Sequence, residues 1–413
     1  MKICLSKINK LLLSAFCIRI LMLVVIMLLG NKLPSLGFID NSPLYDDYRY
    51  EQGGVLYEQQ AEKLIDVDAF TQIFDSMDDR TGHNLEHPLS STPLWYWTVC
   101  ILIYLTRIRW SIRLLNIIIS VLAIKYVYKT VFIVYGERTA QMSAMLLAYL
   151  PYPVIFSCFS YKDCFVSLCT FYILYNAVKI KYIHKITSQE ILLLIICIIS
   201  LFLTRSGLSV VLLSMVALYY YFDKIRDCFI KKKINYKTLI LFICVCAVVV
   251  IILCLFMDVI IYKFKAYNVK DIEYAEALGL GAYIKIYGIN EIWKLPMTYL
   301  VAVMQPINFG EKITSWCSLV SSLNFVMSIV AVGSVLYIFK RNKKDTYFFV
   351  ITFIYYLISA ISSILVFRQL YSLLPIPIIY FAEYYVNCHR DNKKVLMWGS
   401  VLLSLVLLVC FCI

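Results

Sequence analysis

The residues best suited to chemistry are charged side chains that stand at the ends of long apolar segments. The stretch Asp46-Asp47-Tyr48-Arg49-Tyr50 opens an acidic segment, and Glu86-His87 closes it. Three later breaks between apolar runs also carry charges, which gives the candidate set Asp46, Asp47, Arg49, Glu86, His87, Lys162, Asp163, Arg205 and Arg368. Carboxylates beside several cations suit a reaction in which a hydroxyl is deprotonated while a phosphate leaving group is stabilised.

Each of these groups also has a simpler interpretation. Asp46-Asp47 could be a solvated acidic turn, Lys162-Asp163 a helix-end ion pair, and His87 a hydrogen-bonding residue within its loop. The two arginines could be anchors that extend along apolar stems to lipid headgroups. Ionisable groups at a membrane boundary are costly, and several separate turns that place charges on one face favour a shared site.

The elements that must position these residues are membrane-spanning helices. Of the 413 residues, 62% are hydrophobic and 16% are charged, against roughly 45–50% and about 25% in soluble domains. The mean hydropathy is +0.78, which indicates an integral membrane protein. The composition argues against a soluble enzyme or a nucleic-acid partner, although the net charge is +13, because positive charge in such a chain sets topology. Most of the 15 cysteines lie in apolar runs or otherwise lack a pairing pattern, which favours buried thiols over disulfides.

The apolar runs predict an all-α polytopic membrane protein with about 11 transmembrane helices, each of about 20 residues. The predicted crossings are 11–30, 112–134, 139–157, 164–178, 191–204, 207–222, 239–261, 319–339, 347–366, 370–386 and 395–412. Two further stretches, 94–106 and 295–306, have 13 and 12 residues and are too short to cross. We expect both to lie at the outer interface, and we expect two membrane modules, 1–222 and 223–413.

The distribution of positive charge predicts the orientation. The segments 179–185, 224–237, 340–344 and 390–394 carry 3, 6, 4 and 3 basic residues. With eleven crossings, all four lie on the side of the lysine-rich N-terminus, which is therefore predicted to be cytoplasmic. The outer face then carries the loop 31–93, with 12 acidic and 4 basic residues, and a second loop, 262–294.

Several motifs, taken in order, resemble those of one family. They are Asp46-Asp47-Tyr48-Arg49-Tyr50, Glu86-His87-Pro88 with Leu94-Trp95-Tyr96-Trp97, Arg113-Leu114-Leu115-Asn116, Gly136-Glu137-Arg138 followed by Lys162-Asp163, and Phe367-Arg368. Their order and spacing resemble the N-terminal module of GT-C glycosyltransferases that use polyprenyl-phosphate sugars, such as lipid A aminoarabinose transferases and protein O-mannosyltransferases. The chain departs from that pattern at His87, where a lysine is common.

The resemblance implies roles for the candidate residues. Asp46 would be the catalytic base, supported by Asp47, and a divalent cation, Mg²⁺ or Mn²⁺, would be held by Asp46 and Glu86. The cations that would bind the lipid phosphate are Lys162, Arg205 and Arg368, with Arg49 and His87 as further substrate-binding residues. Asp163 would orient Lys162 or His87.

These observations predict a glycosyltransferase in a bacterial plasma membrane. It would move a sugar from an outer-facing polyprenyl-phosphate donor to an envelope glycan, lipid or protein. The first alternative is an O-antigen or capsule-type polysaccharide polymerase, with Arg205 and Arg368 as its outer-facing arginines. The second is a secondary transporter or flippase, which the sequence favours less because it shows no inverted repeat and few mid-membrane charges.

The orientation can be tested by cysteine labelling in intact cells. We expect cysteines introduced in 31–93 or at Lys162 to react with an impermeant thiol reagent, and a cysteine at Lys232 to stay unlabelled until the cells are opened. Labelling of the Lys232 cysteine in intact cells would contradict the predicted topology.

Overall fold

The computed structural model describes residues 2–30, 46–78, 93–231, 289–304, 326–340 and 371–412, and within these ranges it contains helices and no strands. The chain is therefore an all-α membrane protein, as the sequence predicts. Four helical segments of the described part are long and apolar enough to cross a bilayer: Lys7–Leu28, Ser111–Tyr135, Asp163–Ile183 and Ser188–Arg205. The count of eleven crossings stays a prediction, since 239–261 and 347–366 lie outside the described residues.

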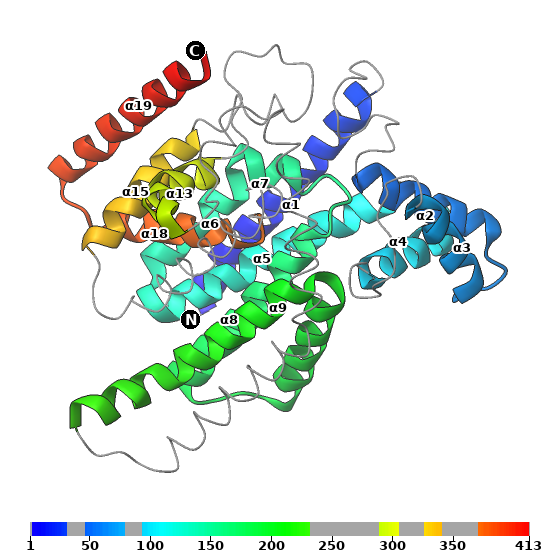
Figure 1. Cartoon of the computed structure of the whole chain (residues 1–413), viewed down its shortest axis with the longest axis horizontal. Helices are drawn as coiled ribbons and strands as arrows, with labels where there is room; N and C mark the ends of the chain where they lie inside the picture. Colours follow the sequence, from blue (N-terminus) through cyan, green and yellow to red (C-terminus); the bar gives the residue numbers. More distant parts are fainter. Residues whose placement is uncertain are drawn as a thin grey trace.

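The centre of the bundle is helix α5 (Ser111–Tyr135), which packs against α1 (Lys2–Gly30), α6 (Glu137–Tyr149) and α8 (Asp163–Ile183) (Figure 1). Several polar residues of α5 are buried, and one of them, Asn116, forms hydrogen bonds to a neighbouring segment. The amide nitrogen Nδ2 of Asn116 donates to the carbonyl oxygens of Phe159 and Tyr161 at 2.6 and 2.8 Å. This pair of hydrogen bonds fixes the turn that precedes α8.

The predicted crossing 139–157 is two helices rather than one. Helix α6 ends at Tyr149, and the short helix α7 (Pro151–Phe156) follows. Leu150, between them, is extended at φ −60° and ψ 135°, because a residue before proline is restricted to that region. The chain leaves the helix at this point, so carbonyl groups in the last turn of α6 have no helical N–H partner.

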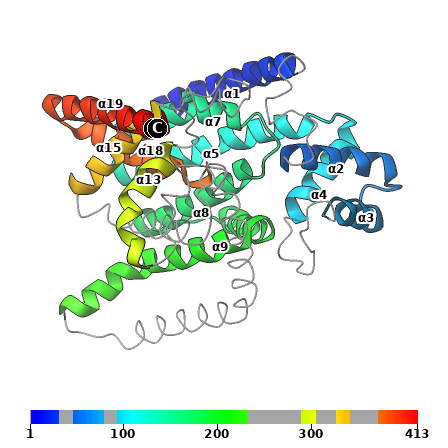
Figure 2. The same ribbon diagram turned by 45° about the horizontal axis from the view of Figure 1, so that its top comes forward.

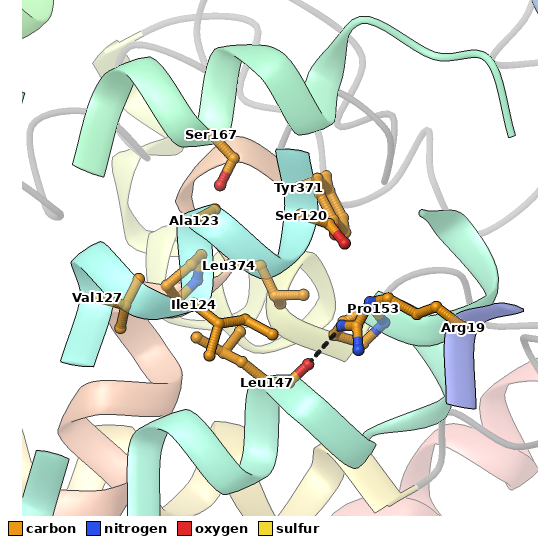
Figure 3. A pocket seen from close by; sticks show the side chains of 11 residues that line it. Arg19, Ser120, Ala123, Ile124, Val127, Leu147, Pro153, Ser167, Tyr371 and Leu374 are labelled. Atoms are coloured by element: carbon orange, nitrogen blue, oxygen red, sulfur yellow. Dashed lines mark hydrogen bonds between the residues drawn. The ribbon is translucent and has the colours of Figure 1, made fainter. Parts of the chain in front are cut away.

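Arg19 of α1 supplies the missing donors. Its guanidinium donates from Nη1 to the carbonyl of Ala148 at 3.0 Å and from Nη2 to that of Leu147 at 2.9 Å. Figure 3 shows the bond to Leu147. Nη1 also donates to Ala15 of its own helix at 3.1 Å. The side chain is 1% exposed, so these bonds lie in the interior. The negative end of the α6 dipole stabilises the buried positive charge.

Helix α9 (Ser188–Lys231) consists of two arms joined by a sharp bend at Arg205, where φ is −156° and ψ is 75° (Figure 1). The first arm runs antiparallel to α8, since Lys179 pairs with Glu190 near one end and Asp163 with Arg205 at the other. Near the Glu190 end, Lys181 donates to the carbonyl of Tyr219 on the second arm. The second arm therefore turns back toward the end of α8 where the first arm begins.

The described part of the acidic loop is helical. Helices α2 (Asp46–Gln60) and α3 (Val67–Asp78) gather with α4 (Pro93–Thr106) at one side of the bundle (Figures 1 and 2). Phe70 of α3 stacks on Trp97 of α4 with ring centroids 4.0 Å apart. Gly54 lets α2 approach α4 closely, because a Cβ there would lie 2.5 Å from Cδ1 of Ile103.

The C-terminal elements complete the bundle. They are η2 (Ile289–Lys294), α13 (Leu295–Met304), α15 (Met327–Lys340), η5 (Tyr371–Leu373), α18 (Pro375–Asn387) and α19 (Arg390–Cys412). Helix α18 packs between α15 and α6, and the hydroxyl of Thr139 donates to Glu383 at 2.6 Å. The two predicted modules therefore contact each other directly.

Arg19 should be a stabilising residue. Replacing it with methionine leaves buried carbonyls of α6 without a hydrogen bond, which lowers the free energy of unfolding by about 1–3 kcal/mol for each carbonyl. Part of this loss is offset, because the variant no longer has to bury a charged side chain. We expect Arg19→Met to lower the thermal unfolding midpoint of the purified protein in detergent, by the equivalent of about 1–3 kcal/mol. The exposed Leu21, on the same helix, gives the control Leu21→Met, which should unfold as the wild type does. Equal midpoints for Arg19→Met and the control would contradict the role of Arg19.

Candidate active site

A buried carboxylate joins the acidic helix α2 to the bundle. Glu51 accepts hydrogen bonds from Arg113 of α5, from Nε to Oε1 at 2.6 Å and from Nη2 to Oε2 at 3.0 Å. Nε of Arg109 donates to Oε2 at 3.0 Å, and the hydroxyl of Ser160 donates to Oε1 at 2.8 Å. We call Glu51, Arg109, Arg113 and Ser160 the Glu51 cluster. It ties together α2, the start of α5 and the turn before α8.

The two arginines of this cluster compensate the negative charge of Glu51. Glu51 is 1% exposed, and Arg109 keeps part of its side chain in contact with solvent. Burial by itself would raise the pKa of the Glu51 carboxyl, but the charge and hydrogen bonds of Arg113, with Arg109 and Ser160, outweigh burial and lower the pKa. Glu51 is therefore ionised at neutral pH and acts as a fixed anion between two arginines.

A second ion pair lies beside the first along the chain. Three residues after Ser160, Oδ1 of Asp163 accepts a hydrogen bond from Nη1 of Arg205 at 2.9 Å. The carboxylate is 2% exposed, and the arginine side chain is 21% exposed. The pairing follows from the fold, because α8 begins at the level where α9 bends. The predicted role of Asp163 in orienting Lys162 or His87 stays a prediction, and the structure adds Arg205 as a partner of Asp163.

The turn before α8 is held from three sides. Nε1 of Trp95 donates to the carbonyl of Ser160 at 3.0 Å, in addition to the bonds from Asn116 and the bond to Glu51. Lys162 follows directly and occupies the N-cap position of α8. The cation at Lys162 and the Asp163–Arg205 pair are therefore attached to a rigid turn at the same end of the bundle as the Glu51 cluster.

The other predicted site residues are described less fully. Asp46, Asp47 and Arg49 form the first turn of α2, and the structure describes their backbone but not their side chains. Glu86, His87 and Arg368 lie outside the described residues. Within the described ranges, no three histidine, cysteine or acidic side chains gather around a possible metal position. The Mg²⁺ or Mn²⁺ site at Asp46 and Glu86 therefore stays a prediction from the sequence.

Sequence reasoning missed Glu51 and the partners that surround it. Arg113 was recognised only as part of a motif, and Arg109 and Ser160 were not singled out. One signal was present: Glu51 follows Asp46 by five residues in the acidic segment, and Arg113 is a lone charge at the start of an apolar run. Charges isolated in this way need partners, but the sequence does not say which of the many acidic residues in 31–93 is the partner.

The described part of the chain is thus an all-α membrane bundle with two buried carboxylates paired to arginines, and with a helical acidic segment at the same end. Residues 86–252 match the model of a family described as dolichyl-phosphate-mannose-protein mannosyltransferase. This match supports the GT-C superfamily and a glycosyltransferase activity for this membrane protein. The matched segment includes Glu86, His87, Lys162, Asp163 and Arg205. No curated protein and no solved structure matches the chain.

The Glu51 cluster should contribute strongly to stability. Removing one partner of a buried ion pair costs about 3–5 kcal/mol, because the remaining charge is left without compensation. We expect Glu51→Gln to lower the unfolding midpoint far more than Glu58→Gln does. Glu58 lies two turns further along α2 and pairs with the exposed Arg107, an interaction of a kind worth at most about 1 kcal/mol.

Lowering the pH should also distinguish the stability of Glu51→Gln from that of the wild type. The pKa of Glu51 is lowered in the folded protein, so its contribution is present above the unfolded-state value of about 4.3 and disappears as the pH falls through the folded-state pKa. The acid-induced loss of stability should therefore be smaller in Glu51→Gln than in the wild type. Identical acid profiles, together with equal midpoints for the two variants, would show that Glu51 does not hold α2.

Proposed function

We propose that this chain transfers a sugar from a polyprenyl-phosphate donor, bound at the outer face of a bacterial plasma membrane, to an envelope glycan, lipid or protein. The observation that carries the proposal is the match of residues 86–252 to a family named for a transfer from dolichyl-phosphate-mannose. The lipid bilayer would hold the donor's polyprenyl chain. Its phosphate would then lie at headgroup depth.

The geometry of the cations supports a phosphate-binding role. The Asp163 carboxylate is buried and the Arg205 side chain is partly exposed, so the anion can fix the guanidinium while leaving it within reach of a ligand. A guanidinium offers planar paired donors that match phosphate oxygens. Lys162 follows the anchored turn, and we assign Arg368 to the same phosphate. Arg49, Glu86 and His87 would contact the sugar or the donor's headgroup.

The proposed reaction is a single displacement at the anomeric carbon. Asp46 accepts the proton of the acceptor hydroxyl, whose oxygen forms a bond to the anomeric carbon. The bond from that carbon to the phosphate oxygen breaks, and the lipid phosphate leaves with its charge balanced by Lys162, Arg205 and Arg368. The configuration at the anomeric carbon is inverted. Asp47 would support Asp46, and no step here depends on the predicted Mg²⁺ or Mn²⁺.

The support for Asp46 comes from the anchoring of α2. Helix α2 begins at Asp46, and Glu51, little more than one turn later, is tied to the same turn of chain that leads into Lys162. The base and the phosphate-binding cations would thus be attached to a common rigid element. A polysaccharide polymerase would also need outer-facing arginines, but the match to a mannosyltransferase model favours a transferase with a monosaccharide donor.

Asp46→Asn should remove most turnover while donor binding is retained. A carboxylate that accepts a proton in the transition state contributes about 10²–10⁴-fold to the rate and little to ground-state affinity. The assay incubates purified protein with radiolabelled polyprenyl-phosphate sugars and envelope acceptors, and measures transfer and donor affinity separately. Asp47→Asn should be milder, and Asp68→Asn, on helix α3, is the matched control and should be fully active. A loss below about fivefold in Asp46→Asn would refute its role as the base.

A further inference from the structure

A second charged cluster lies at the end of the bundle opposite to the Glu51 cluster. Sixteen residues of α5 separate Arg113 from Lys129, or about 24 Å along the helix axis at 1.5 Å per residue. Around Lys129, three helices bring together lysine and tyrosine side chains. We call this group the lysine–tyrosine cluster; it consists of Lys125, Tyr126 and Lys129 of α5, Tyr172, Tyr175 and Lys179 of α8, and Glu190 of α9.

Two aromatic rings flank the Lys129 ammonium group. Its nitrogen Nζ lies 5.4 Å from the ring centroid of Tyr126 and 5.3 Å from that of Tyr175. Tyr126 packs edge-on against Tyr172 at 4.8 Å, and Tyr126 and Tyr175 lie 5.7 Å apart. The rings hold the amine in place by cation–π attraction. The amine is therefore fixed where a freely extended lysine would be mobile.

The cluster carries more positive than negative charge. Its three lysines face one carboxylate, Glu190, which leaves a surplus of +2. Both oxygens of Glu190 are already engaged, Oε1 by Lys179 and Oε2 by the backbone N–H and the hydroxyl of Thr187. Among the residues that the structure describes, no carboxylate forms a salt bridge with Lys129.

The position of Lys129 within the helix makes its uncompensated positive charge energetically unfavourable. Lys129 lies six residues before the end of α5, about 9 Å inside it, and is only partly exposed. An ionisable group at that depth in a membrane-spanning helix is retained where it binds something. Ile118 and Leu122, on the same face of α5 as Lys125 and Lys129, are exposed. Exposed apolar residues on the first arm of α9, among them Ile195 and Ile199, form a second lipid-facing surface.

We propose that the lysine–tyrosine cluster binds the phosphate group of an anionic phospholipid in the leaflet at this end of the bundle. Lys129 and Lys125 contact the phosphate oxygens, and an acyl chain of the lipid lies along Ile118 and Leu122. Basic pockets between membrane helices bind anionic headgroups in this way. The site is distinct from the donor site, because the length of α5 separates the two.

The test measures lipid retained by the purified full-length chain in neutral detergent, by native mass spectrometry. The probes are dioleoyl phosphatidylglycerol and, as the neutral control, dioleoyl phosphatidylcholine. We expect the wild type to retain the anionic lipid preferentially. Lys129→Gln should lower its affinity for that lipid by about fivefold or more, the effect of one lysine near a lipid phosphate. Lys129→Arg should keep the affinity. The matched control is Lys185→Gln, an exposed lysine beyond the end of α8, which should bind as the wild type does.

Three results would overturn the proposal. Equal losses in Lys129→Gln and Lys185→Gln would show general surface charge, and equal retention of the two lipids would show that no anionic site exists. Displacement of the lipid by millimolar inorganic phosphate would mean that the ligand is a soluble anion. If Lys129→Gln does not yield folded protein, Lys125→Gln carries the same test, with the same expected loss. No sugar donor is added, so the result is independent of the proposed transfer reaction.

Discussion

The buried contact between Glu51 and Arg113 is the constraint on which the functional end of this molecule depends. A carboxylate with 1% exposure is tolerated only if its charge is compensated, and the compensation comes from two arginines and a serine hydroxyl on other elements. Satisfying Glu51 therefore brings α2, the start of α5 and the turn at Ser160 together. The Asp163–Arg205 pair follows from that turn within three residues, so its position depends on the same contact.

Breaks in the helices are compensated by charge elsewhere in the bundle. Where Pro151 ends α6, the guanidinium of Arg19 donates hydrogen bonds to two carbonyl oxygens of that helix. Where α9 bends, Arg205 stands at the bend and pairs with Asp163. In an apolar environment a broken helix exposes polar backbone at high cost, and an arginine can reach and satisfy several acceptors at once. The buried Arg19 and the partly exposed Arg205 are thus part of the architecture, and Arg205 is in addition a candidate for substrate binding.

The sequence was informative wherever a property depends on local composition. Hydrophobic length predicted the crossings 112–134 and 164–178, which lie within α5 and α8, and the break near Arg205 that separates the two arms of α9. Long-range pairing could not be predicted, because Glu51, Asp163 and Arg19 each had several possible partners that only the packing of helices distinguishes. The interruption at Leu150 could have been predicted from Pro151 and Pro153, but the apolar length of 139–157 concealed it. The orientation, the metal and the roles of Asp46 and Arg368 are still predictions.

The bend at Arg205 also has a consequence for the surrounding bilayer. The first arm of α9 spans Ser188–Arg205, which is 18 residues or about 27 Å, and the hydrocarbon layer of a bilayer is about 30 Å thick. A span that is too short can be accommodated by local thinning of the bilayer, which would draw the lipid headgroups toward α9. Phosphates of the adjacent leaflet then lie nearer to Arg205 than in an undisturbed membrane. Hydrophobic mismatch at a single helix would thus shorten the path that a lipid-linked phosphate travels to reach the protein.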